Sequence, residues 1–205
     1  IHVPNHDKRT IDALLQYART EWWDEVILLG DLMDFDYLAK FNKGKFRKLE
    51  LKRIKKDYDV ANYFLDDLES ATNTYGSTKY TLIQGNHDER IERYIHEHPE
   101  LEGMVEVENG LDLKGRGWNW VPYAAKGTPY KIGKALFIHG IYVGDRAEKQ
   151  HVEAYGKNVF FGHVHSMASY AKRSIGDNDV KVGQSLGCLC KYKPYYLAGF
   201  ADRWQ

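Results

Sequence analysis

The sequence predicts an α/β fold in which two packed, mixed β-sheets are flanked by helices. Short apolar runs of strand length alternate along the chain with segments of helical periodicity, an order typical of α/β proteins. The 205 residues, 43% of them hydrophobic, suffice for one domain with a sizeable core. We therefore expect a single domain over residues 1–205, with a helical insertion at about 37–75.

The beginning of the chain predicts a strand end, a helix and a second strand. Residues 1–7 are expected to end a strand and enter a loop, and Asp7 can cap the helix that follows. The apolar residues of this helix share one face: Ile11, Leu14, Leu15 and Ala18. Residues 25–29 are an apolar strand, so the chain opens as a βαβ-type unit.

The middle of the chain predicts two helices on either side of a buried strand. The insertion should contain a long amphipathic helix, because its apolar residues alternate at steps of four and three: Ile54, Tyr58, Ala61, Leu65 and Leu68. Residues 80–84 follow as an apolar strand. Residues 89–98 are expected to be a short helix that Pro99 stops.

The rest of the chain predicts a second set of strands and one more helix. Residues 103–117 are Gly-rich and are expected to form a loop. The expected strands cover 118–121, 130–132, 135–138, 159–161, 169–172 and 180–185. Gly133-Lys134 should join two of them as a hairpin turn. A capping-box-like sequence at Asp145 should begin a helix that ends near Gly156.

Polar residues suited to metal chemistry follow several of these apolar runs directly. The segments are Gly30-Asp31-Leu32-Met33-Asp34, Gly85-Asn86-His87-Asp88, His139-Gly140 and Gly162-His163-Val164-His165, and Ile1-His2-Val3-Pro4 opens the chain. Each segment alone is compatible with an ordinary turn, but their repetition argues against coincidence. Because ligands gather at the carboxyl ends of strands in α/β folds, we expect these side chains to form one site.

This set of segments resembles the calcineurin-like metallophosphoesterases, whose blocks run D-x-H, GD-x-x-D, GNH(D/E), H and GH-x-H. The resemblance extends from His2 to His165, with the blocks in the family's order. Glu89-Arg90 after the GNHD block and the compact length look similar to bacterial and phage-encoded members. The resemblance implies a four-layer αββα sandwich and a binuclear metal centre that hydrolyses phosphate esters by a metal-bridging water or hydroxide.

The resemblance also implies a role for each motif residue. The implied metal ligands are Asp31, which bridges both ions, His2 and His165 at one ion, and Asn86, His139 and His163 at the other. His87 would be the acid that protonates the leaving oxygen, and Asp34 would hydrogen-bond His87 and fix its tautomer. Apart from the resemblance, Arg90 and Arg93 lie within a turn or two of the site, so either could hold a substrate phosphate; we favour Arg90, with a surface salt bridge as the alternative. Asp88 is compatible with a helix cap and with a catalytic role.

The mixture of imidazole, carboxylate and amide ligands suits two divalent metal ions. Manganese is the first choice, with iron, zinc, nickel and cobalt as alternatives. One family position is missing, because an Asp two residues before the first motif His would precede Ile1. We expect that the sequence is a fragment trimmed at both ends; the alternative is a first metal site that lacks a ligand.

Three functions are compatible with these motifs. The basic 40–56 segment favours a phosphodiesterase or nuclease-type activity, because a basic lip near the metals would receive a polyanion such as nucleic acid. The alternative for this segment is a solvated helix face. A phosphomonoesterase on nucleotides or phosphoproteins is the second hypothesis, although Phe35-Asp36 stands where the family's protein phosphatases carry Arg-Gly. A non-catalytic metal-binding scaffold is the third.

Bulk properties restrict the partners of the protein. The formal net charge is zero, so no global field draws the chain to nucleic acid or to a membrane, and any contact with nucleic acid would be local. No apolar run reaches membrane-spanning length. Two cysteines, Cys188 and Cys190, fit a reducing cytoplasm, and we interpret them as packing beside a strand rather than as metal or redox groups. The sequence leaves the oligomeric state open.

Overall fold

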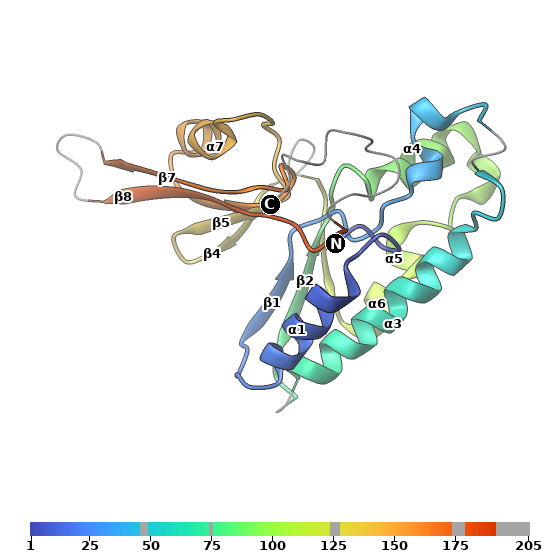
Figure 1. Cartoon of the computed structure of the whole chain (residues 1–205), viewed down its shortest axis with the longest axis horizontal. Coiled ribbons are helices and arrows are strands. Elements are labelled where there is room, and N and C mark those ends of the chain that lie inside the picture. Colours follow the sequence, from blue (N-terminus) through green and yellow to red (C-terminus); the bar gives the residue numbers. More distant parts are fainter. Residues whose placement is uncertain (46–48, 74–75, 124–127, 174–178, 192–205) are drawn as a thin grey trace.

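The described strands form two β-sheets that lie side by side in the molecule (Figure 1). The computed structural model describes residues 1–45, 49–73, 76–123, 128–173 and 179–191. The first sheet has the order β1-β2-β3 and the second the order β4-β5-β6-β8-β7. The strands are β1 Glu25–Leu28, β2 Lys79–Ile83, β3 Asn119–Val121, β4 Tyr130–Ile132, β5 Ala135–Ile138, β6 Asn158–Phe161, β7 Met167–Arg173 and β8 Val180–Leu186. An α/β fold with two sheets is therefore confirmed.

The two sheets differ in strand direction. The pairs β1–β2 and β2–β3 are both parallel. The prediction of two mixed sheets is therefore wrong for the first sheet, as far as its described residues go. The second sheet is mixed, since β5, β6 and β8 run parallel while β4 and β7 are antiparallel to their neighbours. The strands predicted in the second half of the chain all form, including the β4–β5 hairpin.

Helices cover both sheets. The α-helices of the described residues are α1 Lys8–Ala18, α3 Ile54–Thr72, α4 Glu89–Glu97, α5 Val107–Gly110, α6 Leu113–Arg116 and α7 Ala147–Tyr155, and short 3-10 helices are η1 Asp36–Leu38, η2 Lys40–Asn42 and η3 Pro99–Leu101. In Figure 1, α1 and α3 lie along the first sheet, while α7 lies on the second sheet, with which it shares contacts. The long amphipathic helix predicted in the insertion is confirmed as α3.

Local capping explains where α1 begins. The Asp7 carboxylate accepts a hydrogen bond from the backbone N–H of Thr10 at 3.0 Å, which satisfies one of the free donors at the helix start. Ile11, Leu15 and Ala18 are buried on one face, as their spacing predicts. This face joins the core that α1 and α3 share with β1 and β2.

Three local predictions are wrong. Residues 1–7 form no strand; Val3 makes only an isolated parallel bridge to Met33. The segment 103–117 is not a plain loop, because it contains α5 and α6, and Asp112 caps α6 through a hydrogen bond from Gly115. Asp145 does not cap α7, whose N-cap is Arg146 and has no side-chain hydrogen bond.

Hydrogen bonds join the two sheets at the ends of their parallel strands. His139 follows β5, and its Nδ1 donates to the backbone oxygen of Leu29, after β1, at 2.7 Å. The backbone N–H of Gly162, after β6, donates to the backbone oxygen of His139 at 2.9 Å. The polar segments that follow β1, β5 and β6 are thus fixed against one another.

None of the helices in the described part of the chain combines the length and the hydrophobicity that crossing a bilayer requires.

A close contact between α7 and β8 yields a stability prediction. A Cβ at Gly183 would overlap the backbone oxygen of Glu148 and the side chain of Val152. Gly183→Ala should therefore lower the free energy of unfolding by about 1–3 kcal/mol, as overpacking does. Urea denaturation measures this change, with Val180→Ala as the control because Val180 is 49% exposed on the same strand. An unchanged midpoint for Gly183→Ala would contradict this packing.

Candidate metal centre

The polar segments that follow β1, β2, β5 and β6 meet in one place, beside the start of the chain. The sequence-predicted ligands that converge there are His2, Asp31, Asn86, His139, His163 and His165. Three of them are almost fully buried: His2 and His139 are each 1% exposed, and Asp31 is 3% exposed. All six residues singled out as ligands are therefore neighbours in space.

One group of side chains gathers around Nε2 of His139. This nitrogen lies 3.0 Å from Oδ1 of Asn86, 3.2 Å from Nδ1 of His163 and 3.3 Å from Oδ2 of Asp31. The other ring nitrogen, Nδ1, donates to the backbone oxygen of Leu29, which fixes the tautomer and turns the Nε2 lone pair toward the group. Asn86, His139 and His163 lie together as the motif order predicts.

A second group lies on the other side of Asp31. Nε2 of His2 is 2.8 Å from Nε2 of His165 and 3.6 Å from Oδ2 of Asp31. The two histidines of the GHVH segment therefore separate, with His163 in the first group and His165 in the second. Asp31 lies between the groups, in a position from which its carboxylate reaches both.

The backbone is strained where it presents these residues. Residues with positive φ that are not glycine include four of the candidate ligands: His2 at 60°, Asp31 at 51°, His163 at 65° and His165 at 59°. Such left-handed conformations are uncommon outside glycine and cost of order 1–3 kcal/mol each. Strain of this kind persists only where the surrounding structure fixes it, and it gathers at functional sites.

His87, Asp34 and Arg90 form a network beside the two groups. Nδ1 of His87 lies 2.7 Å from Oδ1 of Asp34, the contact that the sequence predicts. Arg90 donates from Nη1 to the backbone oxygen of Asp34 at 2.7 Å, and its Nη2 lies 3.0 Å from Nε2 of His87. Arg90 is thus part of the site rather than of a surface salt bridge. Asn5, which sequence reasoning missed, donates from Nδ2 to Oδ2 of Asp34.

The position of Asp88 bears on a question that the sequence left open, between a helix cap and a catalytic role. Its Oδ1 accepts from the backbone N–H of Met33 and its Oδ2 from that of Gly85, both at 2.8 Å. The side chain makes no capping hydrogen bond to α4. Asp88 therefore ties the segment after β1 to the segment after β2, and it is 0% exposed.

The cysteines lie closer to the site than the sequence indicates. Sγ of Cys190 donates to Sγ of Cys188 at 3.4 Å, and this hydrogen bond lowers the pKa of Cys188 to about 6 and raises that of Cys190. Cys190 falls within reach of His2 and His165. Only the Cys-x-Cys spacing could have drawn attention to this pair.

The pKa values of several ionisable groups in the site lie far from their ordinary values. Burial raises the pKa of a carboxyl, but the neighbouring histidines outweigh burial and hold the pKa of Asp31 well below its usual range. Burial likewise opposes protonation of His139, but the charge of Asp31 raises its pKa. Burial lowers the pKa of His2 and of His163 to about 4. Most of these rings are therefore neutral at pH 7, as metal ligands must be.

The ligand set fits divalent cations. Possible ligand atoms lie close together in each group: Nε2 of His139 lies 3.0 Å from Oδ1 of Asn86 and 3.3 Å from Oδ2 of Asp31, and the Nε2 atoms of His2 and His165 lie 2.8 Å apart. Nδ1 of His2, on the other side of the ring, is buried and faces Oδ1 of Asp34 at 3.6 Å, just beyond hydrogen-bond distance. A cation satisfies such converging acceptors at once, and imidazole with carboxylate and amide oxygen suits first-row transition metals.

A cavity of about 530 Å³ adjoins the network at Asn86 and Arg90. Its lining includes aromatic and basic side chains, among them Tyr37, Lys40, Phe41, Lys43, Arg93 and Tyr94. Of the described basic residues of the 40–56 segment, Lys40 and Lys43 line this cavity. Lys52 pairs with Asp36 and Lys55 with Asp59, while Arg47 and Lys48 lie outside the described residues.

Comparisons with known proteins find two relatives from phages. No family model matches the chain, and no solved structure matches it significantly. The chain is similar to the Gene 54 protein of Mycobacterium phage L5, with 26% identity over 214 residues that span 99% of this chain and 82% of that protein. It is also similar to the Gene 54 protein of Mycobacterium phage D29, with 27% identity over the same shares. Neither name states an activity.

The buried histidines predict a pH dependence of stability in the absence of metal. His2 and His163 have pKa values near 4 when folded, below the ordinary value of 6.5. Between these values the unfolded chain binds more protons, so stability should fall as the pH drops from 6.5 to about 4. Urea midpoints across this range measure it. His163→Gln should flatten the dependence and exposed His96→Gln should not, whereas a midpoint that rises on acidification would contradict the assignment.

Proposed function

We propose that this chain is a calcineurin-like metallophosphoesterase that uses two divalent metal ions to hydrolyse phosphate esters, and phosphodiesters first. The observation that carries the proposal is the convergence of six motif side chains, with Asp31 between the other five; four of the six lie on left-handed backbone. A structural role for these residues gives no reason for so much strain at one point. The similarity to two phage proteins supports a phage-type member.

The proposed fold is the four-layer αββα sandwich of that superfamily. Helices α1 and α3 share a core with β1 and β2, and α7 packs with β5 and β6, which supports a helical layer outside each sheet. Two free thiols at Cys188 and Cys190 support a cytoplasmic location.

The proposed metal positions follow the two groups of side chains. Asn86, His139 and His163 would hold one ion, His2 and His165 the other, and Asp31 both. Manganese remains the first choice, with iron, zinc, nickel and cobalt as alternatives. When bound, such ions stabilise the charge on a phosphoryl group and lower the pKa of a water.

The network of His87, Asp34 and Arg90 would provide the proton for the leaving oxygen of the substrate. Asp34 holds Nδ1 of His87 at 2.7 Å, which leaves Nε2 as the atom that can carry a proton to the leaving oxygen. Nη2 of Arg90 lies 3.0 Å from that Nε2, so the guanidinium is placed beside the atom that would meet the leaving oxygen. We infer that the guanidinium of Arg90 contacts a substrate phosphate from this position, next to His87.

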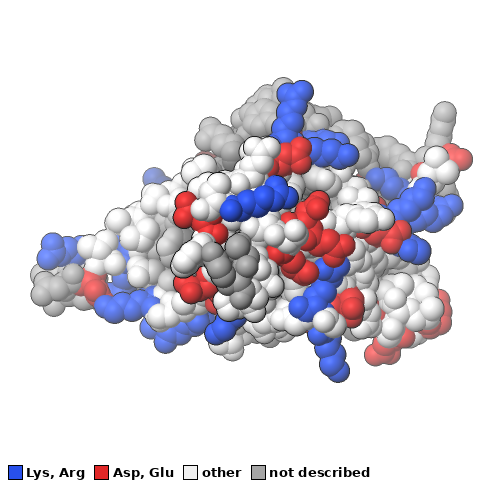
Figure 2. All heavy atoms as spheres, turned by 90° about the horizontal axis from the view of Figure 1, so that it is seen from below, with Lys and Arg blue, Asp and Glu red and all other residues white. Residues whose placement is uncertain are grey.

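The cavity beside Arg90 favours diesters over monoesters. Its volume of about 530 Å³ leaves room for a second substituent on the phosphate. Aromatic rings can stack on a base, and Lys40 and Lys43 can contact further phosphates, although Lys43 also pairs with Glu97 at 2.9 Å. A nuclease-type activity on nucleic acid is therefore the preferred form. On the face shown in Figure 2, basic and acidic residues alternate, which fits local rather than global attraction.

Hydrolysis of bis(p-nitrophenyl) phosphate and p-nitrophenyl phosphate with added Mn²⁺ tests the proposal. The diester should be the better substrate, and His87→Ala should lose roughly 10²–10⁴-fold in turnover while keeping its metal, because it loses only the acid. His96→Ala is the matched control, an exposed histidine of α4.

The other outcomes separate the alternatives. Preference for the monoester would move the assignment to a phosphomonoesterase on nucleotides or phosphoproteins. Hydrolysis of neither substrate by metal-loaded protein would favour the non-catalytic scaffold. Full activity in His87→Ala would remove His87 from the proposed role.

A further inference from the structure

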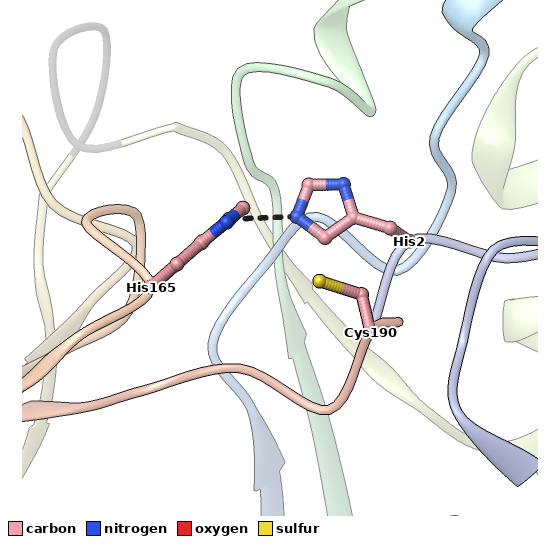
Figure 3. Close-up of side chains that lie close together, drawn as sticks. All are labelled: His2, His165 and Cys190. Atoms are coloured by element: carbon pink, nitrogen blue, oxygen red, sulfur yellow. Dashed lines mark hydrogen bonds between the residues drawn. The ribbon is translucent and has the colours of Figure 1, made fainter. Parts of the chain in front are cut away.

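Cys190 lies beside the two histidines of the second group. Its Sγ and one ring nitrogen each of His2 and His165 all fall within 4.8 Å of one another. All three residues are buried, with 7% of Cys190, 1% of His2 and 8% of His165 exposed. Figure 3 shows the sulfur directed toward the space next to the facing ring nitrogens. The same sulfur donates a hydrogen bond to Sγ of Cys188 at 3.4 Å, so it faces both the other thiol and the two rings.

The backbone fixes Cys190 in this position from both sides. Cys190 forms an isolated antiparallel bridge with His6, four residues after His2. The N–H of Asp7 donates to the oxygen of Leu189, and the N–H of Lys191 donates to the oxygen of Asn5, both at 2.9 Å. The segment that carries Cys190 is therefore hydrogen-bonded to the segment that leaves His2, and this pairing holds the sulfur in its place.

We propose that Cys190 is a metal ligand, and that with His2, His165 and Asp31 it forms a position that selects zinc over manganese. This inference rests on the proposed metal centre and adds a ligand and a metal preference to it. Two imidazoles, a thiolate and a carboxylate make a four-ligand set of the kind that zinc takes, whereas manganese prefers oxygen ligands. On binding, Sγ of Cys190 releases its proton to solvent and gives its electron pair to the ion.

Cys188 provides the matched control. It is two residues away, and its Sγ lies 3.4 Å from that of Cys190. Among the described residues, however, the grouping with His2 and His165 contains Cys190 and not Cys188. Since the whole chain has only two cysteines, removal of either one identifies the other as the source of any sulfur signal.

The test is a titration of the metal-free protein with Co²⁺ in a non-thiol reductant, followed by absorption spectroscopy. Wild type and Cys188→Ser should both show the near-ultraviolet charge-transfer band of a cobalt–thiolate bond. Cys190→Ser should lose that band and keep visible bands from histidine-bound cobalt. In a parallel competition experiment with zinc, Cys190→Ser should weaken zinc binding and leave Mn²⁺ binding nearly unchanged. The loss of zinc affinity should be at least the roughly 10–100-fold loss that follows removal of a residue hydrogen-bonded to a metal ligand.

Each other outcome overturns the inference. Cobalt that binds to wild type without a sulfur band leaves the proposed metal centre standing and removes Cys190 from it. If the band disappears in Cys188→Ser, the sulfur ligand is Cys188 and not Cys190. If wild type binds no cobalt at all, both the proposed metal centre and the Cys190 ligand fail. The decisive comparison uses wild type and Cys188→Ser, so it does not require Cys190→Ser to fold.

Discussion

The carboxylate of Asp31 is held almost out of contact with water, at a point where segments from both sheets meet. Taking such a charge out of water costs several kcal/mol unless its surroundings compensate. Its Oδ1 accepts the backbone N–H of His87 at 2.8 Å, while its Oδ2 faces ring nitrogens of His2 and His139. Gly85 is required next to it, because any Cβ there would overlap the carboxylate. The left-handed turns at the neighbouring ligands are the geometry that brings their rings to this one charge, and Asp88 ties two of the segments together behind it.

The fold supplies the rigidity that this arrangement needs. The strained backbone at Asp31, His163 and His165 follows β1 and β6, which are hydrogen-bonded within the two sheets, and each sheet has its own hydrophobic cluster with its helices. The stability of those clusters offsets the strain and the burial of polar groups at the centre, so that the proposed ligands would already be in place when a cation binds. Preorganisation of this kind is what metal-assisted hydrolysis demands of a protein, because the chain's part in it is to fix ligands and orient the groups that move protons.

Much of this arrangement could be predicted from the sequence, because it follows local rules. The short apolar runs predict the strands, and α1 and α3 follow from periodicity and, for α1, from the Asp7 cap. The roles of the site residues, in contrast, came from the resemblance of their motifs to the calcineurin-like metallophosphoesterases. What could not be predicted depends on contacts between distant segments. Cys190 reaches His2 only through backbone pairing of the chain's two ends, and the hydrogen bonds of Asp88 to Met33 and Gly85 require the loops to be already adjacent. The helices within 103–117 were missed because glycine-rich composition outweighed short capped turns.

The most direct test of the account is the number of metal ions bound per chain, measured by elemental analysis after equilibrium dialysis against Mn²⁺ and Zn²⁺. Wild type should bind two ions. Asp31→Asn removes the central charge but keeps a residue that tolerates the left-handed backbone, so it should lose both ions or bind them far more weakly. Asp12→Asn, an exposed change on α1, should bind as wild type does. Wild type that binds no ion, or Asp31→Asn that still binds two with unchanged affinity, would contradict the central place of this carboxylate.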